Sequence, residues 1–225
     1  NHVYDVSEDK NGLLWLATDG GGINSFDPVS EEFSHFRHNP KKTNSLSTDR
    51  VRIAKIDSSG KFWIGTNGGG LEYFDPKTGL FTHYTHDENN PHSLAHNRIY
   101  AMYLDIEVEN VVWLGTYGGG LSKLDLATGK FTNYKNVPED STSLSNDFVL
   151  SVYKDMSGTI WVGTSVGLCK MDSQTGTFTT YTDEHGLPDI VIYDVIADNN
   201  NELWISTNRG LTRFHPDSLD FKTYD

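Results

Sequence analysis

The chain has 225 residues, 36% of them hydrophobic, with a formal net charge of −13 and one cysteine. This length allows one sizeable core, and the modest apolar content suits antiparallel sheets, in which alternate side chains face water. The negative charge argues against nucleic acid or an anionic membrane surface as a partner, and a single cysteine excludes an internal disulfide and a cysteine-based zinc site.

The sequence has no apolar run of the length that a membrane helix needs, and no signal-peptide pattern. We therefore expect no direct membrane insertion by this segment. The chain begins at Asn1, directly before residues that are typical of a β-strand. We expect it to be part of a longer protein.

Five tryptophans recur along the chain at spacings of 48, 50, 48 and 43 residues: Trp15, Trp63, Trp113, Trp161 and Trp204. Before each one, a β-branched and aromatic run ends in aspartate and is followed by a short turn. After it come a glycine-rich turn, a third β-rich run such as 71–75, a second tight turn, and a fourth run such as 80–84. Each unit is therefore predicted to form four short strands, with no helical periodicity.

Four antiparallel strands repeated at this period are typical of a β-propeller blade. We predict an all-β fold, a β-propeller with five four-stranded antiparallel blades. The repeat domain covers 1–225, with units at about 1–48, 49–96, 97–146, 147–189 and 190–225. The five blades either close by themselves or belong to a larger ring.

Aromatic residues are expected to form the core between blades, because a blade cannot bury both faces of its own sheet. The tryptophans should occupy equivalent buried positions in the second strands. Aromatic pairs of the fourth strands should join them: Phe33/Phe36, Phe81/Tyr84, Phe131/Tyr134, Phe178/Tyr181 and Phe221/Tyr224.

Strand order places the turn between the second and third strands on one face, together with the connection to the next blade. Loops on this face vary, whereas those on the opposite face are short and nearly uniform, and variable loops on a rigid scaffold commonly carry function. We therefore predict a ligand site from Asp19, Asn67, Tyr117, Ser165, Asn208 and Arg209 in the turns, with Arg50 and Arg98 at the starts of first strands. Tyr117 would stack on a sugar ring, while the amides and Arg209 would bind hydroxyls. The alternative is that these are ordinary solvated turns.

The first strands would line a central channel, with Asp5 and Asp194 at equivalent positions. Two carboxylates there raise the alternatives of glycosidase-like catalysis or a bound cation, but their sequence context assigns neither role. The histidines lack metal-ligand spacing, and there is no nucleophile elbow. We therefore predict no catalytic residue, no metal ligand and no cofactor.

The repeated sequence resembles the two-component regulator propeller repeat. The fourth unit carries the pattern most fully, in Asp155, Gly158, Trp161, Gly163, Thr164, Gly167, Leu168, Gly176, Phe178 and Tyr181. The linkers 44–47, 89–94 and 142–146 also resemble that family. One departure is the number of units, because sensors of the family usually have seven-bladed rings.

This resemblance implies a periplasmic sensor domain of a membrane-bound receptor, often a hybrid two-component histidine kinase that responds to oligosaccharides. It implies a carbohydrate or other small polar ligand, further blades or output domains of the same receptor, and a homodimer as partners. The alternatives are a protein-interaction scaffold without a small ligand and, less favoured, a lyase or glycosidase on a propeller scaffold.

Overall fold

The computed structural model describes residues 2–224 and contains five four-stranded antiparallel sheets, each formed by consecutive strands. The predicted all-β fold is confirmed; the one helical element among the described residues is the short 3-10 turn η1 (Asp183–His185). We call the sheets blades 1 to 5. The strands of blade 1 are β1 (His2–Glu8), β2 (Leu14–Asp19), β3 (Gly22–Asp27) and β4 (Glu32–Phe36).

The other blades repeat this order. Blade 2 has β5 (Val51–Ile56), β6 (Phe62–Thr66), β7 (Leu71–Asp75) and β8 (Leu80–Tyr84). Blade 3 has β9 (Ile99–Asp105), β10 (Val111–Thr116), β11 (Leu121–Asp125) and β12 (Lys130–Tyr134). Blade 4 has β13 (Val149–Lys154), β14 (Ile160–Thr164), β15 (Gly167–Met171) and β16 (Phe178–Tyr181). Blade 5 has β17 (Ile192–Ala197), β18 (Leu203–Thr207), β19 (Gly210–His215) and β20 (Asp220–Tyr224).

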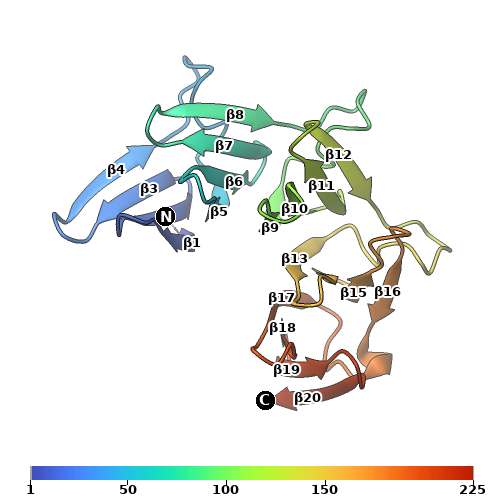
Figure 1. Ribbon diagram of the computed structural model, residues 1–225. Helices are drawn as coiled ribbons and strands as arrows, with labels where there is room; N and C mark the ends of the chain where they lie inside the picture. The colour runs from blue at the N-terminus through green and yellow to red at the C-terminus, as the bar shows by residue number, and fades with distance from the viewer. Residues whose placement is uncertain (1, 225) are drawn as a thin grey trace.

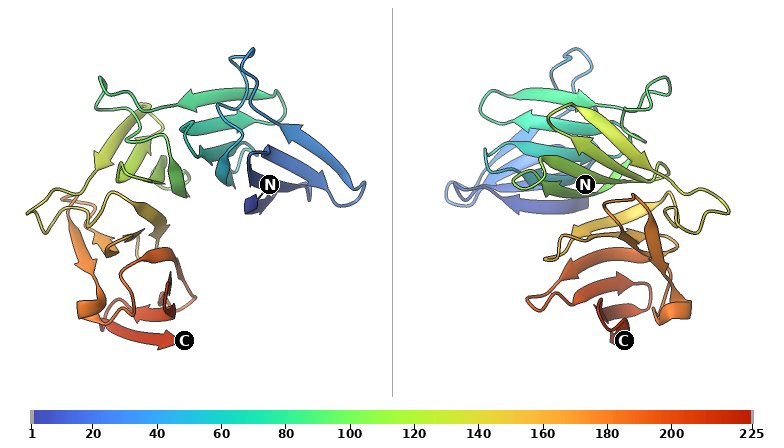
Figure 2. Two further views of the ribbon diagram at one scale, coloured as in Figure 1. Left: turned by 180° about the vertical axis from the view of Figure 1, so that it is seen from behind. Right: turned by 45° about the vertical axis from the view of Figure 1, so that its right-hand side comes forward.

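The blades follow one another around an open arc, with the first strand of each at the inner rim and the fourth at the outer rim (Figures 1 and 2). Neighbouring first strands contact each other along the rim, from β1 to β5, β9, β13 and β17. Blades 1 and 5 face a gap and do not meet. The five blades therefore do not close by themselves, which answers the question that the sequence left open.

Four apolar cores lie between successive blades, and in each the tryptophan of one blade packs against the sheet of the next. Trp161, for example, is fully buried against Leu203, Ile205 and Phe214 of blade 5. Trp15, Trp63 and Trp113 pack in the same way against blades 2, 3 and 4. Burial of these indoles contributes much of the stability of the arc.

The prediction that all five tryptophans are buried is wrong for Trp204, which is only half-buried. The prediction for the fourth-strand aromatics is likewise wrong at the two ends, since Phe33 is 56% exposed and Tyr224 is 38% exposed. The reason is the same in each case. Trp204 and Tyr224 face the side on which a following blade would pack, and Phe33 faces the side on which a preceding blade would pack.

The connections between blades are held by buried leucines. Leu46, Leu94 and Leu144 are fully buried, and each carbonyl accepts a hydrogen bond from the side chain that follows the preceding fourth strand. The pairs are His38 with Leu46 at 2.6 Å, His86 with Leu94 at 2.7 Å and Asn136 with Leu144 at 2.8 Å. The glycine-rich turns fit beside these connections. Gly70 has a φ of 88°, and a Cβ there would lie 2.4 Å from the carbonyl oxygen of Tyr84, so only glycine fits without strain.

The aspartate after the first-strand run anchors the turn to the tryptophan. In blades 1, 4 and 5 its carboxylate accepts the indole N–H, in the pairs Asp9–Trp15 (3.1 Å), Asp155–Trp161 (2.8 Å) and Asp198–Trp204 (3.2 Å). In blade 2 the carboxylate accepts the Tyr73 hydroxyl at 2.9 Å instead, and in blade 3 it pairs with the Lys154 ammonium group. Consequently the buried indole nitrogens of Trp63 and Trp113 have no partner among the described residues.

We expect these carboxylates to make the fold sensitive to acid. Burial by itself raises the pKa of Asp155, but hydrogen bonds from donors that include Ser157 and Trp161 more than offset it, so the pKa lies below 3.8. The pKa of Asp198 is also lowered, chiefly by the hydrogen bond from Trp204. Because each pKa is lower in the folded than in the unfolded state, the stabilisation is complete above the unfolded pKa and disappears as the pH falls through the folded pKa.

The urea midpoint should therefore be nearly constant from about pH 7 to pH 5 and should fall below about pH 4. The urea midpoint of Asp155→Asn should be lower than that of the wild type at pH 7. It should also fall by a smaller amount when the pH is lowered. The same acid-induced change in midpoint for the wild type and Asp155→Asn would contradict the role assigned to this carboxylate.

Candidate ligand-binding site

A bulge in the first strand of every blade creates the lining of the inner rim. The pairing with the second strand shifts at Val3/Asp5, Val51/Ile53, Val149/Ser151 and Ile192/Asp194, and at the matching point of β9. A bulge leaves one residue unpaired and re-aims its side chain. The residues at the bulge are Tyr4, Arg52, Tyr100, Leu150 and Tyr193, and all five line a rim pocket of about 460 Å³.

The Arg52 guanidinium lies between two aromatic rings of this rim. Its Cζ is 4.1 Å from the ring centre of Tyr4 and 4.4 Å from that of Tyr100. This is cation–π geometry on both faces. Among residues 2–224, no carboxylate lies within ion-pair distance of Arg52, so its N–H donors are not taken by an acid.

Aromatic contacts extend this row onto the variable face. The Tyr100 ring stacks on Tyr117 with centroids 4.9 Å apart, and Tyr117 packs against Phe148 at 4.4 Å. Tyr117 is 37% exposed and Phe148 is 39% exposed, so both keep ring surface open to solvent. We call Tyr4, Arg52, Tyr100, Tyr117 and Phe148 the aromatic row.

The predicted site residues occupy the variable face in neighbouring pairs. The turn residue of one blade bridges to the first strand of the next, in Asp19–Arg50, Asn67–Arg98 and Tyr117–Phe148. Arg50 Nε donates to Asp19 Oδ1 at 3.0 Å, so these two charges already satisfy each other. Arg98 is exposed beside the half-buried Asn67.

The remaining predicted residues lie farther along the arc. The Ser165 hydroxyl donates to Asn146 Oδ1 at 3.0 Å. Asn208 accepts the Tyr193 hydroxyl at 2.8 Å, and Arg209 lies 4.0 Å from Asp189 with its side chain 76% exposed. Asn208 and Arg209 are in blade 5, at the opposite end of the arc from Asp19 (Figure 1). The predicted residues therefore form a curved line along the arc.

The two channel carboxylates are engaged separately. Asp5 accepts the backbone N–H of Ala54 at 3.1 Å and pairs with Lys55 Nζ at 3.3 Å. Asp194 accepts the Ser151 hydroxyl at 2.9 Å. They belong to the end blades, across the gap from one another (Figure 2). Within the described part of the chain, no group of three or more His, Cys, Asp or Glu side chains is placed to hold a metal ion.

Sequence reasoning missed the residues at the bulge, although a signal was present. Val51, Ala54 and Ile56 all belong to the core with blade 1, whereas Ile53 packs toward blade 3. Strict alternation cannot place Val51 and Ala54 on the same side of a strand. The break in alternation marks Arg52 as the residue that points to the rim.

The family model for the two-component regulator propeller matches residues 1–20, 143–166 and 186–209. These three segments match the two-component regulator propeller repeat. These matches include the second strands of blades 1, 4 and 5, each with its tryptophan. No curated protein matches the chain.

Solved structures with similar folds include the extracellular domains of two putative signalling systems. The extracellular domain of the putative hybrid two-component system BT3049 from B. thetaiotaomicron is 26% identical, with a TM-score of 0.78 over 99% of this chain. The extracellular domain of the putative one component system BT4673 from the same organism is 23% identical, with a TM-score of 0.82 over 100% of this chain. The propeller repeats described here span 28% and 31% of those two chains.

An enzyme also shares the fold of these propeller repeats. Virginiamycin B lyase from Staphylococcus aureus is 14% identical, with a TM-score of 0.72 over 99% of this chain and 69% of the lyase. At this identity the likeness concerns the fold alone, and a shared fold does not carry an activity. In residues 2–224 there is no helix with the length and apolarity required to cross a membrane.

Proposed function

We propose that this chain is part of the extracytoplasmic ligand-sensing domain of a membrane-bound receptor, in a hybrid two-component or similar signalling system. The propeller repeats and the likeness to the BT3049 extracellular domain support this assignment. The domain itself binds rather than catalyses, because its conspicuous surface chemistry consists of aromatic rings and a guanidinium group. Rigid-body movement of the stiff propeller would carry the signal to the rest of the receptor.

The proposed ligand is an oligosaccharide or another small polar molecule that binds along the aromatic row. The observation that carries this proposal is the uninterrupted series of contacts from Tyr4 through Arg52 and Tyr100 to Tyr117 and Phe148. Exposed aromatic rings stack on the apolar faces of sugars, and the guanidinium donors of Arg52 would bind hydroxyl or carboxylate oxygens. Asn67 and Arg98 would extend the site toward blade 2.

Replacing Tyr117 by alanine should weaken ligand binding by about tenfold or more, because a stacking surface worth about 1–3 kcal/mol disappears. The free energy of unfolding should change by no more than about 1 kcal/mol, since Tyr117 lies in a partly exposed turn outside the cores between the blades. Binding is measured by calorimetry against a panel of neutral and acidic oligosaccharides, and folding by urea denaturation.

Arg209→Ala is the comparison variant, because Arg209 is also predicted from the sequence to bind ligand and is an exposed residue of a turn between second and third strands, but it lies in blade 5, outside the aromatic row. Its affinity should equal that of the wild type. An equal loss in both variants would extend the site along the whole arc. Unchanged affinity in a folded Tyr117→Ala protein would overturn the aromatic row as the site.

We further propose that the two end faces of the arc pack against additional blades of the same receptor. The face of blade 1 exposes Val3, Val6 and Phe33 at 51–56%, and the face of blade 5 exposes Ile196 at 55%. The positions equivalent to Val3, Val6 and Phe33 in the other blades belong to the apolar cores, so the face of blade 1 has the composition of a blade interface. A homodimer and a scaffold role without a small ligand stay predictions. A protein that forms a stable dimer and binds no member of the oligosaccharide panel would favour the scaffold role.

A further inference from the structure

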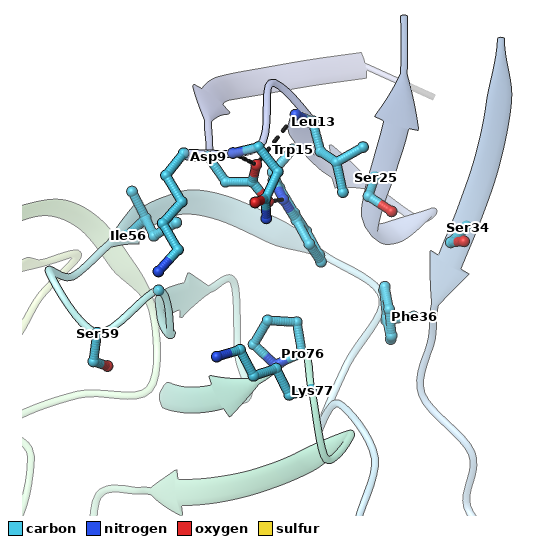
Figure 3. A pocket seen from close by; sticks show the side chains of 13 residues that line it. Asp9, Leu13, Trp15, Ser25, Ser34, Phe36, Ile56, Ser59, Pro76 and Lys77 are labelled. Carbon is cyan, nitrogen blue, oxygen red and sulfur yellow. Dashed lines mark hydrogen bonds between the residues drawn. The ribbon is translucent and has the colours of Figure 1, made fainter. Parts of the chain in front are cut away.

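A pocket of about 270 Å³ lies between blades 1 and 2 on the face of the uniform turns, opposite the variable loops (Figure 3). Its walls come from the β1–β2 turn, from β3 and β4, and from the β5–β6 and β7–β8 turns. Trp15 and Phe36 form an apolar wall, and Pro76 and Lys77 face Trp15 across the opening. No residue of the aromatic row belongs to it.

The pocket exists because blade 1 breaks the repeat at one position. In every blade the tryptophan is paired across the strands with one residue of the third strand. In blades 2 to 5 this residue is long: Tyr73, Lys123, Lys170 and Arg213. The Tyr73 ring covers the Trp63 indole, with ring centroids 4.3 Å apart. Lys123 Nζ lies 5.0 Å from the ring centroid of Trp113.

In blade 1 the corresponding residue is Ser25, and its partner in the next strand is Ser34. Two short hydroxyl side chains cannot reach over Trp15, so the space that a long side chain fills elsewhere stays open. Both serines line the pocket. The opening is thus specific to blade 1.

The charge around the opening is positive. Lys10 and Lys77 line it, both are exposed, and neither has an ion-pair partner among the described residues. The one carboxylate in the lining is Asp9, whose oxygens already accept hydrogen bonds from the backbone of Asn11 and from the Trp15 indole. A ligand therefore meets two free ammonium groups and one carboxylate that is already engaged.

We propose that this pocket binds a small organic anion, namely a carboxylate carried on a single ring. The volume corresponds to about nine water molecules and falls just below the range of drug-sized sites, which suits one ring with its substituents. The ring would lie against Trp15, Phe36 and Pro76, and the carboxylate would sit between Lys10 and Lys77. The chain carries a net charge of −13 and repels anions as a whole. At this pocket the two lysines attract them instead.

The test uses calorimetry with four probes: benzoate and glucuronate as ring carboxylates, and benzamide and glucose as their neutral counterparts. At least one anion should bind about tenfold more tightly than its neutral counterpart, as a charge-assisted contact implies. Its affinity should fall as sodium chloride is raised, since exposed charges are screened. The preferred ring, aromatic or sugar, identifies the source of the carboxylate.

Ser25→Tyr is the decisive variant, because it copies the arrangement of Tyr73 over Trp63 in blade 2 and fills the pocket without adding charge. It should bind the anion at least about tenfold more weakly while it keeps the wild-type circular dichroism spectrum. The double variant Lys10→Ala/Lys77→Ala, changed only at exposed side chains, should also lose binding.

Three results would overturn the proposal. The first is that neither anion binds. The second is that each neutral counterpart binds as tightly as its anion. The third is that the affinity of the anion is unchanged in a folded Ser25→Tyr protein or in the double lysine variant. The chemical shift of the Trp15 indole N–H, followed during titration, reports whether binding occurs at this pocket.

Discussion

Replacing Trp161 by alanine should lower the free energy of unfolding by about 3–5 kcal/mol, whereas Trp204→Ala should cost clearly less. Trp161 has no exposed surface and meets the Phe214 ring edge-on at 5.7 Å. Its removal would leave a large cavity between two packed sheets that cannot easily collapse. Trp204 is half-buried, with no following blade against its outer face, so less contact is lost there.

Trp161 and Trp204 are a matched pair, because each makes the same kinds of contact within its own blade. Each indole donates to the aspartate before it, Asp155 or Asp198. Each is also paired across the strands with a cationic residue, Lys170 or Arg213. The difference between the two losses in urea denaturation therefore measures the contact with the next blade. Equal losses would mean that the end face of blade 5 is covered in solution.

The first blade behaves differently from the last one. From the sequence alone, Trp15→Ala and Trp204→Ala are both expected to cost less than Trp161→Ala if the ring is open, because a terminal blade lacks one neighbour. The structure corrects this expectation, because every tryptophan faces the following blade and Trp15 is only 4% exposed. Trp15→Ala should therefore resemble Trp161→Ala. The repeat alone does not say which of the two neighbours a side chain contacts, since that depends on the direction in which the arc is wound.

Much of the fold could be predicted because each unit repeats the same local signals. Tryptophan spacing, the aspartate turns and the aromatic strands all indicate the four-stranded blade, and five copies make the pattern unmistakable. Whether the five blades close into a ring could not be predicted, because closure depends on contacts between the first and last blades. No local sequence pattern encodes these contacts.

The candidate site was less predictable than the fold. The variable turn that contains Tyr117 could be recognised from the repeat, but its stacking on Tyr100 and the position of Arg52 between two tyrosines depend on a bulge. A bulge moves one side chain from the sheet face to the rim. Likewise, Ser25 is unremarkable in the sequence and creates a pocket only because its cross-strand partner is Trp15.

A buried carboxylate in blade 2 leads to the second large expected effect. Glu72 has no exposed surface. It accepts a hydrogen bond from the Ser47 backbone N–H at 3.1 Å, another from the Ser47 hydroxyl, and one from His83 Nδ1. His83 Nε2 in turn faces the carbonyl oxygen of Thr43 at 3.2 Å. Glu72 thus ties the third strand to the fourth and to the connection that leads into blade 2.

Every blade has a polar pair at this point, in which the third-strand member is buried, but the partners differ. The others are Asn24 with His35, Ser122 with Asn133, Cys169 with Thr180 and Thr212 with Thr223. Among these pairs only blade 2 uses a carboxylate. In blades 3 and 4 the equivalent side chain makes one hydrogen bond to the connecting segment, from the Ala95 backbone N–H to the Ser122 hydroxyl and between Cys169 and Ser145, whereas Glu72 accepts two from Ser47. The network should therefore be more sensitive to substitution in blade 2 than in any other blade.

Glu72→Ala should lower the free energy of unfolding by about 2–4 kcal/mol, because the Ser47 and His83 donors would lose their acceptor and the fully buried site of the carboxylate would be left empty. Glu72→Gln keeps an amide oxygen in the same place and should cost about 1 kcal/mol or less. Ser122→Ala, which removes a single hydroxyl at the equivalent position of blade 3, is the control for the site. Urea denaturation at pH 7 separates the three variants. If Gln destabilises the protein as much as Ala does, the negative charge of Glu72, rather than its geometry as an acceptor, holds the connection into blade 2.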